Sequence, residues 1–337
     1  MRAISPQKLG LKKKMYLNFT RDPKATRSGF GDALVTLGKK YNAKNKSPKI
    51  YAVCADLTGS VKMDKFQKAF PKQFVQVGVA EQNLVTVGSG IAAMGKIPFV
   101  SSYAAFMPGR CWEQIRTTIC YNNQNVKLIG AHAGISVGPD GATHQALEDI
   151  ATMRSLPNMV VVVPSDYEQT KAATKAIARY KGPVYLRLTR SATPQFTTSK
   201  TPFIIGKANV LKQGKDITLI AAGPLVFEAI KAAAILKLKP NLSATVIDCH
   251  TIKPLDKNTI ISAAKKTKRI ITIEEHQITG GLGGAVAELL SENHPTLIKR
   301  IGVNDHYGES GEPQELLTKF KLDAKNIVKE AVKLCKR

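Results

Sequence analysis

Short runs rich in β-branched residues alternate with amphipathic stretches of helical length from about residue 26 to the end of the chain. This alternation is typical of α/β folds, in which helices cover the faces of a sheet. Several runs are apolar throughout, as strands buried on both faces are. The expected strands are 50–54, 74–77, 98–102, 126–131, 159–163, 184–188, 217–221, 244–247, 270–273 and 297–301. The expected helices are 28–40, 81–94, 112–121, 145–154, 166–179, 225–236, 259–266, 282–291 and 324–335.

A stretch rich in Ser, Thr and Pro follows Arg190 and interrupts the alternation, as a linker does. With 337 residues the chain is long enough for two domains of ordinary size. We therefore expect two three-layer α/β domains, at 24–195 and 203–337. An N-terminal extension (1–23) precedes them, and residues 196–202 link them.

Charge is the most unusual feature of the composition, with 50 Lys and Arg against 25 Asp and Glu, a net charge of +25. A basic chain suggests nucleic-acid binding, but the lysines are scattered and no basic run is interleaved with stacking aromatics. A solvated lysine-rich surface is the expected reading, and nucleic acid is not an expected partner.

Other features of the composition indicate a reduced, cytoplasmic protein. Hydrophobic residues make up 43% of the chain, which excludes a largely disordered protein. The apolar stretches are too short to span a membrane. The five cysteines form no CxxC pair, so neither a disulfide framework nor a structural zinc site is expected.

Polar and aromatic residues gather where four of the expected strands end, which is where α/β domains carry their active sites. Each has an ordinary structural alternative: Glu81 can complement a helix N-terminus, the Tyr103/Phe106 pair can be core, and GPDG is a turn signal. A carboxylate, an aromatic pair and histidines after strands of one sheet together favour an active site. The residues concerned are Asp56, Ser60, Glu81, Tyr103, Phe106, Arg110, His132, Asp140 and His144.

Several of these segments resemble one enzyme family. ATR at 25–27, ADLTGS, GVAEQN, the Tyr103/Phe106 pair and HAGISVGPDGATHQ are similar to the pyrimidine-binding domain of transketolase. IDCHTIKPLD, TIEEH and GGLGG resemble the transketolase C-terminal domain. The likeness covers about residues 14–337. It implies a thiamine pyrimidine-binding domain followed by a transketolase C-terminal domain.

One part that this family requires has no counterpart in the sequence. Thiamine diphosphate enzymes also need a diphosphate-binding domain, with a Gly-Asp-Gly motif and Asn ligands for Mg²⁺ some way downstream, and GPDG lacks that context. The resemblance therefore implies the C-terminal subunit of a split transketolase. A separate N-terminal subunit would supply the diphosphate domain and the Mg²⁺ ligands, and two chains of each kind would form a heterotetramer.

The resemblance also implies an activity, the transfer of a two-carbon ketol unit from a ketose phosphate to an aldose phosphate in the pentose phosphate pathway. It assigns cofactor binding to Asp56, Glu81, Tyr103 and Phe106, with Glu81 acting on the aminopyrimidine ring. It assigns the sugar phosphate to Arg27, Ser60, His132 and Arg190, a substrate hydroxyl to Asp140, and proton exchange near the reacting carbonyl to His144. Gly109 stands where transketolases often carry a third aromatic, and Arg110 receives no role.

Three alternatives remain open. The beta subunit of a 2-oxo-acid dehydrogenase shares this two-domain layout, but the polar segment from His132 to His144 favours a sugar-phosphate site. 1-Deoxyxylulose-5-phosphate synthase shares several motifs but normally carries its diphosphate domain in the same chain. A basic nucleic-acid-binding protein on a retired enzyme fold is the non-enzyme alternative, against which Glu81, Asp140 and His144 together argue.

Overall fold

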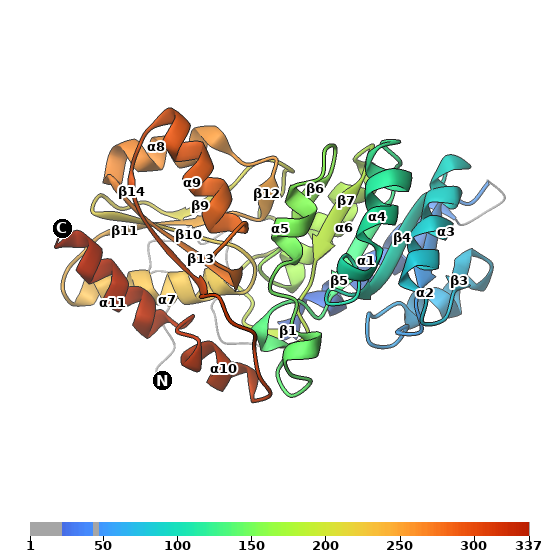
Figure 1. The fold of residues 1–337 in the computed structure, drawn as a ribbon, viewed down its shortest axis with the longest axis horizontal. Coiled ribbons are helices and arrows are strands. Elements are labelled where there is room, and N and C mark those ends of the chain that lie inside the picture. The colour runs from blue at the N-terminus through green and yellow to red at the C-terminus, as the bar shows by residue number, and fades with distance from the viewer. Residues whose placement is uncertain (1–21, 43–46, 337) are drawn as a thin grey trace.

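The computed structural model describes residues 22–42 and 47–336. It contains two large sheets side by side, each with helices on both faces (Figure 1), and a small two-stranded sheet. The predicted class, two α/β domains, is confirmed. The predicted N-terminal extension lies outside the described residues except for its last two.

The first sheet has seven strands in the order β12-β6-β7-β5-β4-β2-β3, all parallel except for the antiparallel edge strand β12. Helices α1, α2 and α6 cover one face, and α3, α4 and α5 cover the other (Figure 1). The strands are β2 (Ile50–Cys54), β3 (Phe74–Gln76), β4 (Ile97–Tyr103), β5 (Lys127–Ala131), β6 (Val160–Val162), β7 (Val184–Arg187) and β12 (Thr251–Lys253). The helices are α1 (Thr26–Tyr41), α2 (Asp64–Ala69), α3 (Glu81–Ala93), α4 (Trp112–Gln114), α5 (Asp149–Arg154) and α6 (Tyr167–Arg179).

The second sheet has five strands in the order β14-β13-β10-β11-β9, and only β9 is antiparallel to its neighbour. Helices α7 and α11 pack on one face, and α8 and α9 on the other. The strands are β9 (Asn209–Lys212), β10 (Ile217–Ala221), β11 (Ala244–Asp248), β13 (Arg269–Gln277) and β14 (Leu297–Val303). The helices are α7 (Leu225–Leu238), α8 (Lys257–Thr267), α9 (Leu282–Asn293), α10 (Pro313–Lys319) and α11 (Ala324–Cys335).

Two expected helices differ from prediction. The stretch expected at 112–121 is α4 followed by a π-helical turn, Ile115–Cys120. The helix expected from residue 145 begins only at Asp149, because Gln145 is drawn into side-chain hydrogen bonds with the backbone of Ile135 and Glu309. At residues 145–148, hydrogen bonds made elsewhere in the fold thus outweigh a local periodicity that indicates a helix.

The two domains are joined closely. Strand β12 comes from the second half of the chain yet pairs with β6 of the first sheet. Asp248, at the end of β11, accepts hydrogen bonds from Ser165 (2.8 Å) and Gln169 (2.5 Å) of the first domain. The stretch expected as a linker is also packed, since Phe196 is fully buried and its N–H donates to Asp166 at 2.9 Å. These contacts join the two domains into one continuous body, which contains the site described below.

Lys127 on β5 is fully buried, and its ammonium group donates to Asn125 (2.6 Å) and to the carbonyls of Tyr180 (2.9 Å) and Gly182 (2.7 Å). We expect Lys127→Met to lower the free energy of unfolding by about 2–3 kcal/mol at pH 7, because it leaves buried acceptors unpaired. Burial lowers the pKa of Lys127 to about 7, below its value of about 10.4 in an unfolded chain. The unfolded chain then binds more protons between these values, so wild-type stability relative to the variant should rise with pH from 7 to 10. Denaturant unfolding of both proteins at pH 7 and pH 9 measures this, and a difference that falls with pH would contradict it.

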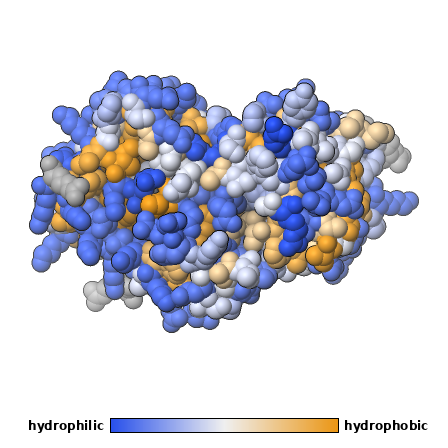
Figure 2. All heavy atoms as spheres, in the orientation of Figure 1, coloured by the Kyte–Doolittle hydropathy of each residue, from blue (hydrophilic) through white to orange (hydrophobic). Residues whose placement is uncertain are grey.

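On the face shown in Figure 2, hydrophilic side chains spread over both domains instead of gathering in one place. All five cysteines are free thiols, and four of them are buried. Among residues 22–42 and 47–336, no helix is both long and apolar enough to cross a membrane.

Candidate active site

The carboxyl ends of the central parallel strands of the first sheet form one edge, and the predicted site residues gather there. Asp56 follows β2, and Tyr103 ends β4. His132 follows β5, and Arg190 lies just beyond β7. Asp56 and His132 both have left-handed backbone, with φ of 57° and 56°. Such backbone is uncommon for residues other than glycine and clusters at functional sites.

A short two-stranded sheet brings the two predicted phosphate-binding arginines to this edge. β1 (Lys24–Ala25) pairs antiparallel with β8 (Ala192–Thr193). The Thr189 N–H also donates to the Thr26 hydroxyl at 2.8 Å. Arg27 and Arg190 each adjoin one of these segments. Burial lowers the pKa of Arg27, and the positive charge of Arg190 lowers it further. The two guanidinium groups therefore share one electrostatic environment.

Glu81 opens α3, but its side chain does more than face a helix N-terminus. It is 1% exposed, and its Oε1 accepts a hydrogen bond from the Ser102 hydroxyl at 3.2 Å. Its Oε2 lies 2.8 Å from Nη1 of Arg110, whose side chain is about half exposed. A buried carboxylate with one half-exposed partner can exchange that partner for a ligand.

Arg110, to which the sequence assigns no role, contacts two of the predicted site residues. Its guanidinium carbon lies 4.9 Å from the centre of the Phe106 ring, in addition to the ion pair with Glu81. The signal was present in the sequence, because Arg110 follows Phe106 by four residues, and the backbone turns helically there. Arg110 thus covers the ring of Phe106.

The predicted aromatic pair is the centre of a cluster of rings. Tyr103 and Phe106 stack with their centres 5.8 Å apart. Tyr103 also stacks on His132 at 3.9 Å, and His144 meets Phe106 edge-on at 5.3 Å. The histidines and the aromatics therefore form one wall. The Nδ1 of His144 is 2.9 Å from the hydroxyl of Thr143.

His132 is neutral in this environment. Burial, together with the charges of Arg27 and Arg190, lowers its pKa to about 3. Nη1 of Arg27 lies 3.2 Å from His132 Nε2 and 2.8 Å from the Ser60 carbonyl oxygen. His132 thus accepts a hydrogen bond from Arg27 and carries its proton on Nδ1, a buried atom without a partner in the described part of the chain. That unpartnered donor is available to a ligand.

The remaining predicted residues lie around this centre. Asp140 is paired with Arg190 at 3.0 Å, and Arg190 also donates to the Val137 carbonyl at 2.8 Å. Ser60 contributes its carbonyl to the cluster. Within the described residues, neither the Ser60 hydroxyl nor the Asp56 carboxylate bonds to another predicted site residue. Asp56 is thus at the same sheet edge but outside the contact cluster.

Across the described residues, no three His, Cys, Asp or Glu side chains come together as metal ligands do.

Comparison with protein families identifies both domains. A model of the transketolase pyrimidine-binding domain matches residues 22–195, and one of the transketolase C-terminal domain matches residues 206–327. The chain belongs to the transketolase family. Membership implies that the enzyme to which the chain contributes depends on thiamine diphosphate.

Individual transketolase relatives narrow this further. A transketolase C-terminal section of Methanocaldococcus jannaschii is 45% identical, over 93% of this chain and 97% of its own length. A 6-deoxy-6-sulfo-D-fructose transketolase subunit of a Clostridium species is 39% identical, over 91% and 94%. A solved split-gene transketolase, described as an inactive β4 tetramer, is 43% identical with a TM-score of 0.84, over 94% of this chain and 99% of that one. The chain is thus a transketolase-like C-terminal section, as its sequence predicts.

Proposed function

We propose that this chain is the C-terminal subunit of a two-chain transketolase that moves a two-carbon ketol unit from a ketose phosphate to an aldose phosphate. The observation that carries the proposal is the buried Glu81 carboxylate beside the Tyr103/Phe106 wall, with two arginines at the same sheet edge. The similarity to C-terminal sections of split transketolases supports the same reading.

The residues present fit the aminopyrimidine half of thiamine diphosphate. A flat heteroaromatic ring needs apolar walls and a hydrogen-bonding group at its edge, which Tyr103, Phe106 and Glu81 provide. When bound, thiamine diphosphate supplies a nucleophilic carbon that accepts the ketol unit. Glu81 would bind a ring nitrogen of the pyrimidine and hold or release a proton there. Arg110 is exposed enough to turn into solvent and free Oε2 of Glu81.

The second half of the proposed site binds the sugar phosphate. Arg27 and Arg190 would supply the positive charge that a phosphate dianion requires. His132 would donate from Nδ1 as a neutral imidazole. Asp140 would accept from a substrate hydroxyl, and His144 would exchange protons with the developing alkoxide at the reacting carbonyl.

The proposal assigns the diphosphate group and Mg²⁺ to a separate N-terminal subunit, and two chains of each kind to the assembly. Asp56, exposed at the edge of the sheet, would approach the cofactor only in that complex.

A substrate comparison tests the proposal. The complex of this chain with its N-terminal subunit is assayed with xylulose 5-phosphate and ribose 5-phosphate, with pyruvate, and with 6-deoxy-6-sulfofructose as donor. We expect turnover with the phosphorylated pair, because two guanidinium groups suit a dianion better than a sulfonate monoanion. Turnover with pyruvate alone would instead support the 2-oxo-acid dehydrogenase or synthase alternatives. Preference for the sulfonate would reassign the donor.

A further inference from the structure

The segment 132–144, which we call the substrate loop, belongs to the first domain but contacts the second domain. Ile135–Val137 forms a short 3₁₀ turn in its middle. Gln145, directly after the loop, donates to the Ile135 carbonyl at 3.0 Å and to the Glu309 carbonyl at 2.9 Å. The loop thus has part of its support outside its own domain.

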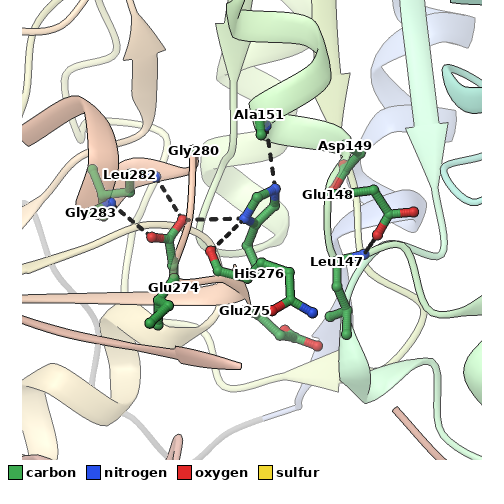
Figure 3. A network of polar contacts seen from close by, with 12 residues as sticks. Leu147, Glu148, Asp149, Ala151, Glu274, Glu275, His276, Gly280, Leu282 and Gly283 are labelled. Carbon is green, nitrogen blue, oxygen red and sulfur yellow. Dashed lines mark hydrogen bonds and ion pairs between the residues drawn. The ribbon is translucent and has the colours of Figure 1, made fainter. Parts of the chain in front are cut away.

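The boundary between the two domains is close to three consecutive buried polar residues of β13, which are Glu274, Glu275 and His276. Figure 3 shows them between α9 and the segment around Ala151. Glu274 stays within its own domain, where it accepts from the N–H groups of Leu282 (2.6 Å) and Gly283 (2.7 Å) at the start of α9. His276 reaches the first domain and accepts from the Ala151 N–H at 3.3 Å. None of these three bonds involves the substrate loop.

Glu275 is different, because its carboxylate bonds to the loop itself. It is 3% exposed, and its Oε1 accepts from the Ser136 N–H at 2.5 Å. Gly134 has φ of 88°, and a Cβ there would overlap the Glu275 carboxylate, so the loop backbone closes directly onto this side chain. A carboxylate bond to a backbone N–H is among the stronger hydrogen bonds in proteins.

The backbone of Glu275 is also fixed to the first domain. Its carbonyl accepts from Nη2 of Arg187 at 2.9 Å, and Nε of Arg187 is paired with the buried Asp149 at 2.8 Å. The carboxylate therefore has little freedom to move away from the loop. Ser136 lies four residues after His132 and four before Asp140, so this one bond fixes the centre of the segment that carries both.

We propose that Glu275 of the second domain is a positioning residue that sets the conformation of the substrate loop. The inference rests on the proposed function only in naming the loop's ligand as the substrate. Glu275 touches neither Glu81 nor the aromatic wall, so it acts on substrate binding and not on cofactor binding. This gives the C-terminal domain a direct part in the site of its neighbour.

The first experiment needs no activity. Amide hydrogen exchange of peptides covering 132–144 is measured on the full chain for wild type, Glu275→Ala and Glu275→Gln. Alanine removes the acceptor, and exchange in the loop should rise at least tenfold, whereas the glutamine oxygen still accepts from Ser136 and should keep exchange within threefold of wild type. Glu275→Asp, which shortens the side chain by one methylene, should act like alanine and serves if alanine does not fold.

The matched control is Asp256→Ala. Asp256 is also buried and accepts a backbone N–H (Ala208, 3.0 Å), but it does so at the N-terminal cap of α8 within the second domain. Its substitution should lower stability without changing exchange in 132–144. Equal loop exchange in the Glu275→Ala and Asp256→Ala variants would overturn the proposal.

The second experiment uses the reconstituted complex. Glu275→Ala should raise KM for the ketose phosphate at least tenfold while the Kd for thiamine diphosphate stays within twofold, and Glu275→Gln should restore KM to within threefold of wild type. A parallel loss of substrate and cofactor binding would indicate a merely structural residue and overturn the inference. An inactive wild-type complex would count against the proposed function alone, since the exchange experiment decides the role of Glu275 separately.

Discussion

Glu81→Gln should lower kcat of the reconstituted enzyme by about a hundredfold or more. Proton transfer by a positioned carboxyl group contributes about 10²–10⁴ in rate, and an amide cannot exchange the proton. Glutamine keeps the size of the side chain and an oxygen for the Ser102 hydroxyl, and the half-exposed Arg110 can be solvated. Steady-state rates at saturating substrate and cofactor measure the effect.

The control for this substitution is Glu113→Gln, which neutralises an exposed carboxylate in the neighbouring helix α4. It should leave kcat unchanged, and thermal unfolding should show both variants folded. A rate for Glu81→Gln within threefold of wild type would mean that Glu81 serves only as a charge at the N-terminus of α3.

Arg27→Gln and Arg190→Gln should each raise KM for the ketose phosphate about tenfold or more. Each removes a charge-assisted contact with the phosphate, which is worth about 1.5–3 kcal/mol. The phosphate group itself provides the specific readout, because the preference for xylulose 5-phosphate over unphosphorylated xylulose should shrink by the same factor. Initial rates over a range of both ketoses measure that preference.

Lys65→Gln provides the comparison, since Lys65 is an exposed cation that pairs with Asp32 outside the site. If it changed KM as much as the two arginine variants do, the effect would come from the general positive charge of the chain. An unchanged preference between the two ketoses in both arginine variants would place the phosphate elsewhere.

Most strands of the seven-stranded sheet could be predicted because its central strands are buried on both faces. Val160–Val162 and the part of β5 from Leu128 to Ala131, for example, are apolar throughout. The missed strands are short and at edges, such as β12 with three residues. Its partner β6 lies about ninety residues earlier in the chain, and a pairing of that kind leaves no periodic signal.

The site could be predicted only as far as residues follow strands. Glu81, Tyr103, Phe106, His132 and His144 do lie at one edge, but their contacts were not readable. Of the partners of Glu81, Ser102 lies in β4 itself, whereas the position of Arg110 depends on how the turn after β4 folds back. The contact between Glu275 and Ser136 could not be predicted, because 139 residues separate the two in the chain.

The protonation of His132 shows a second limit. As a residue type it suggests a cation for an anionic substrate, yet burial, and after it the charges of Arg27 and Arg190, make its protonation unfavourable. The charge that suits a phosphate is therefore carried by Arg27 and Arg190. Their proximity depends on the pairing of β1 with β8, two strands of two residues each.

Activity of the chain alone and in combination tests the central claim most directly. This chain, its N-terminal subunit, and the two mixed at equal concentration are each supplied with thiamine diphosphate, Mg²⁺, xylulose 5-phosphate and ribose 5-phosphate. The account predicts no turnover by either chain alone and transketolase turnover by the mixture. Full turnover by this chain in isolation, or none in a mixture whose complex has been shown to form, would contradict it.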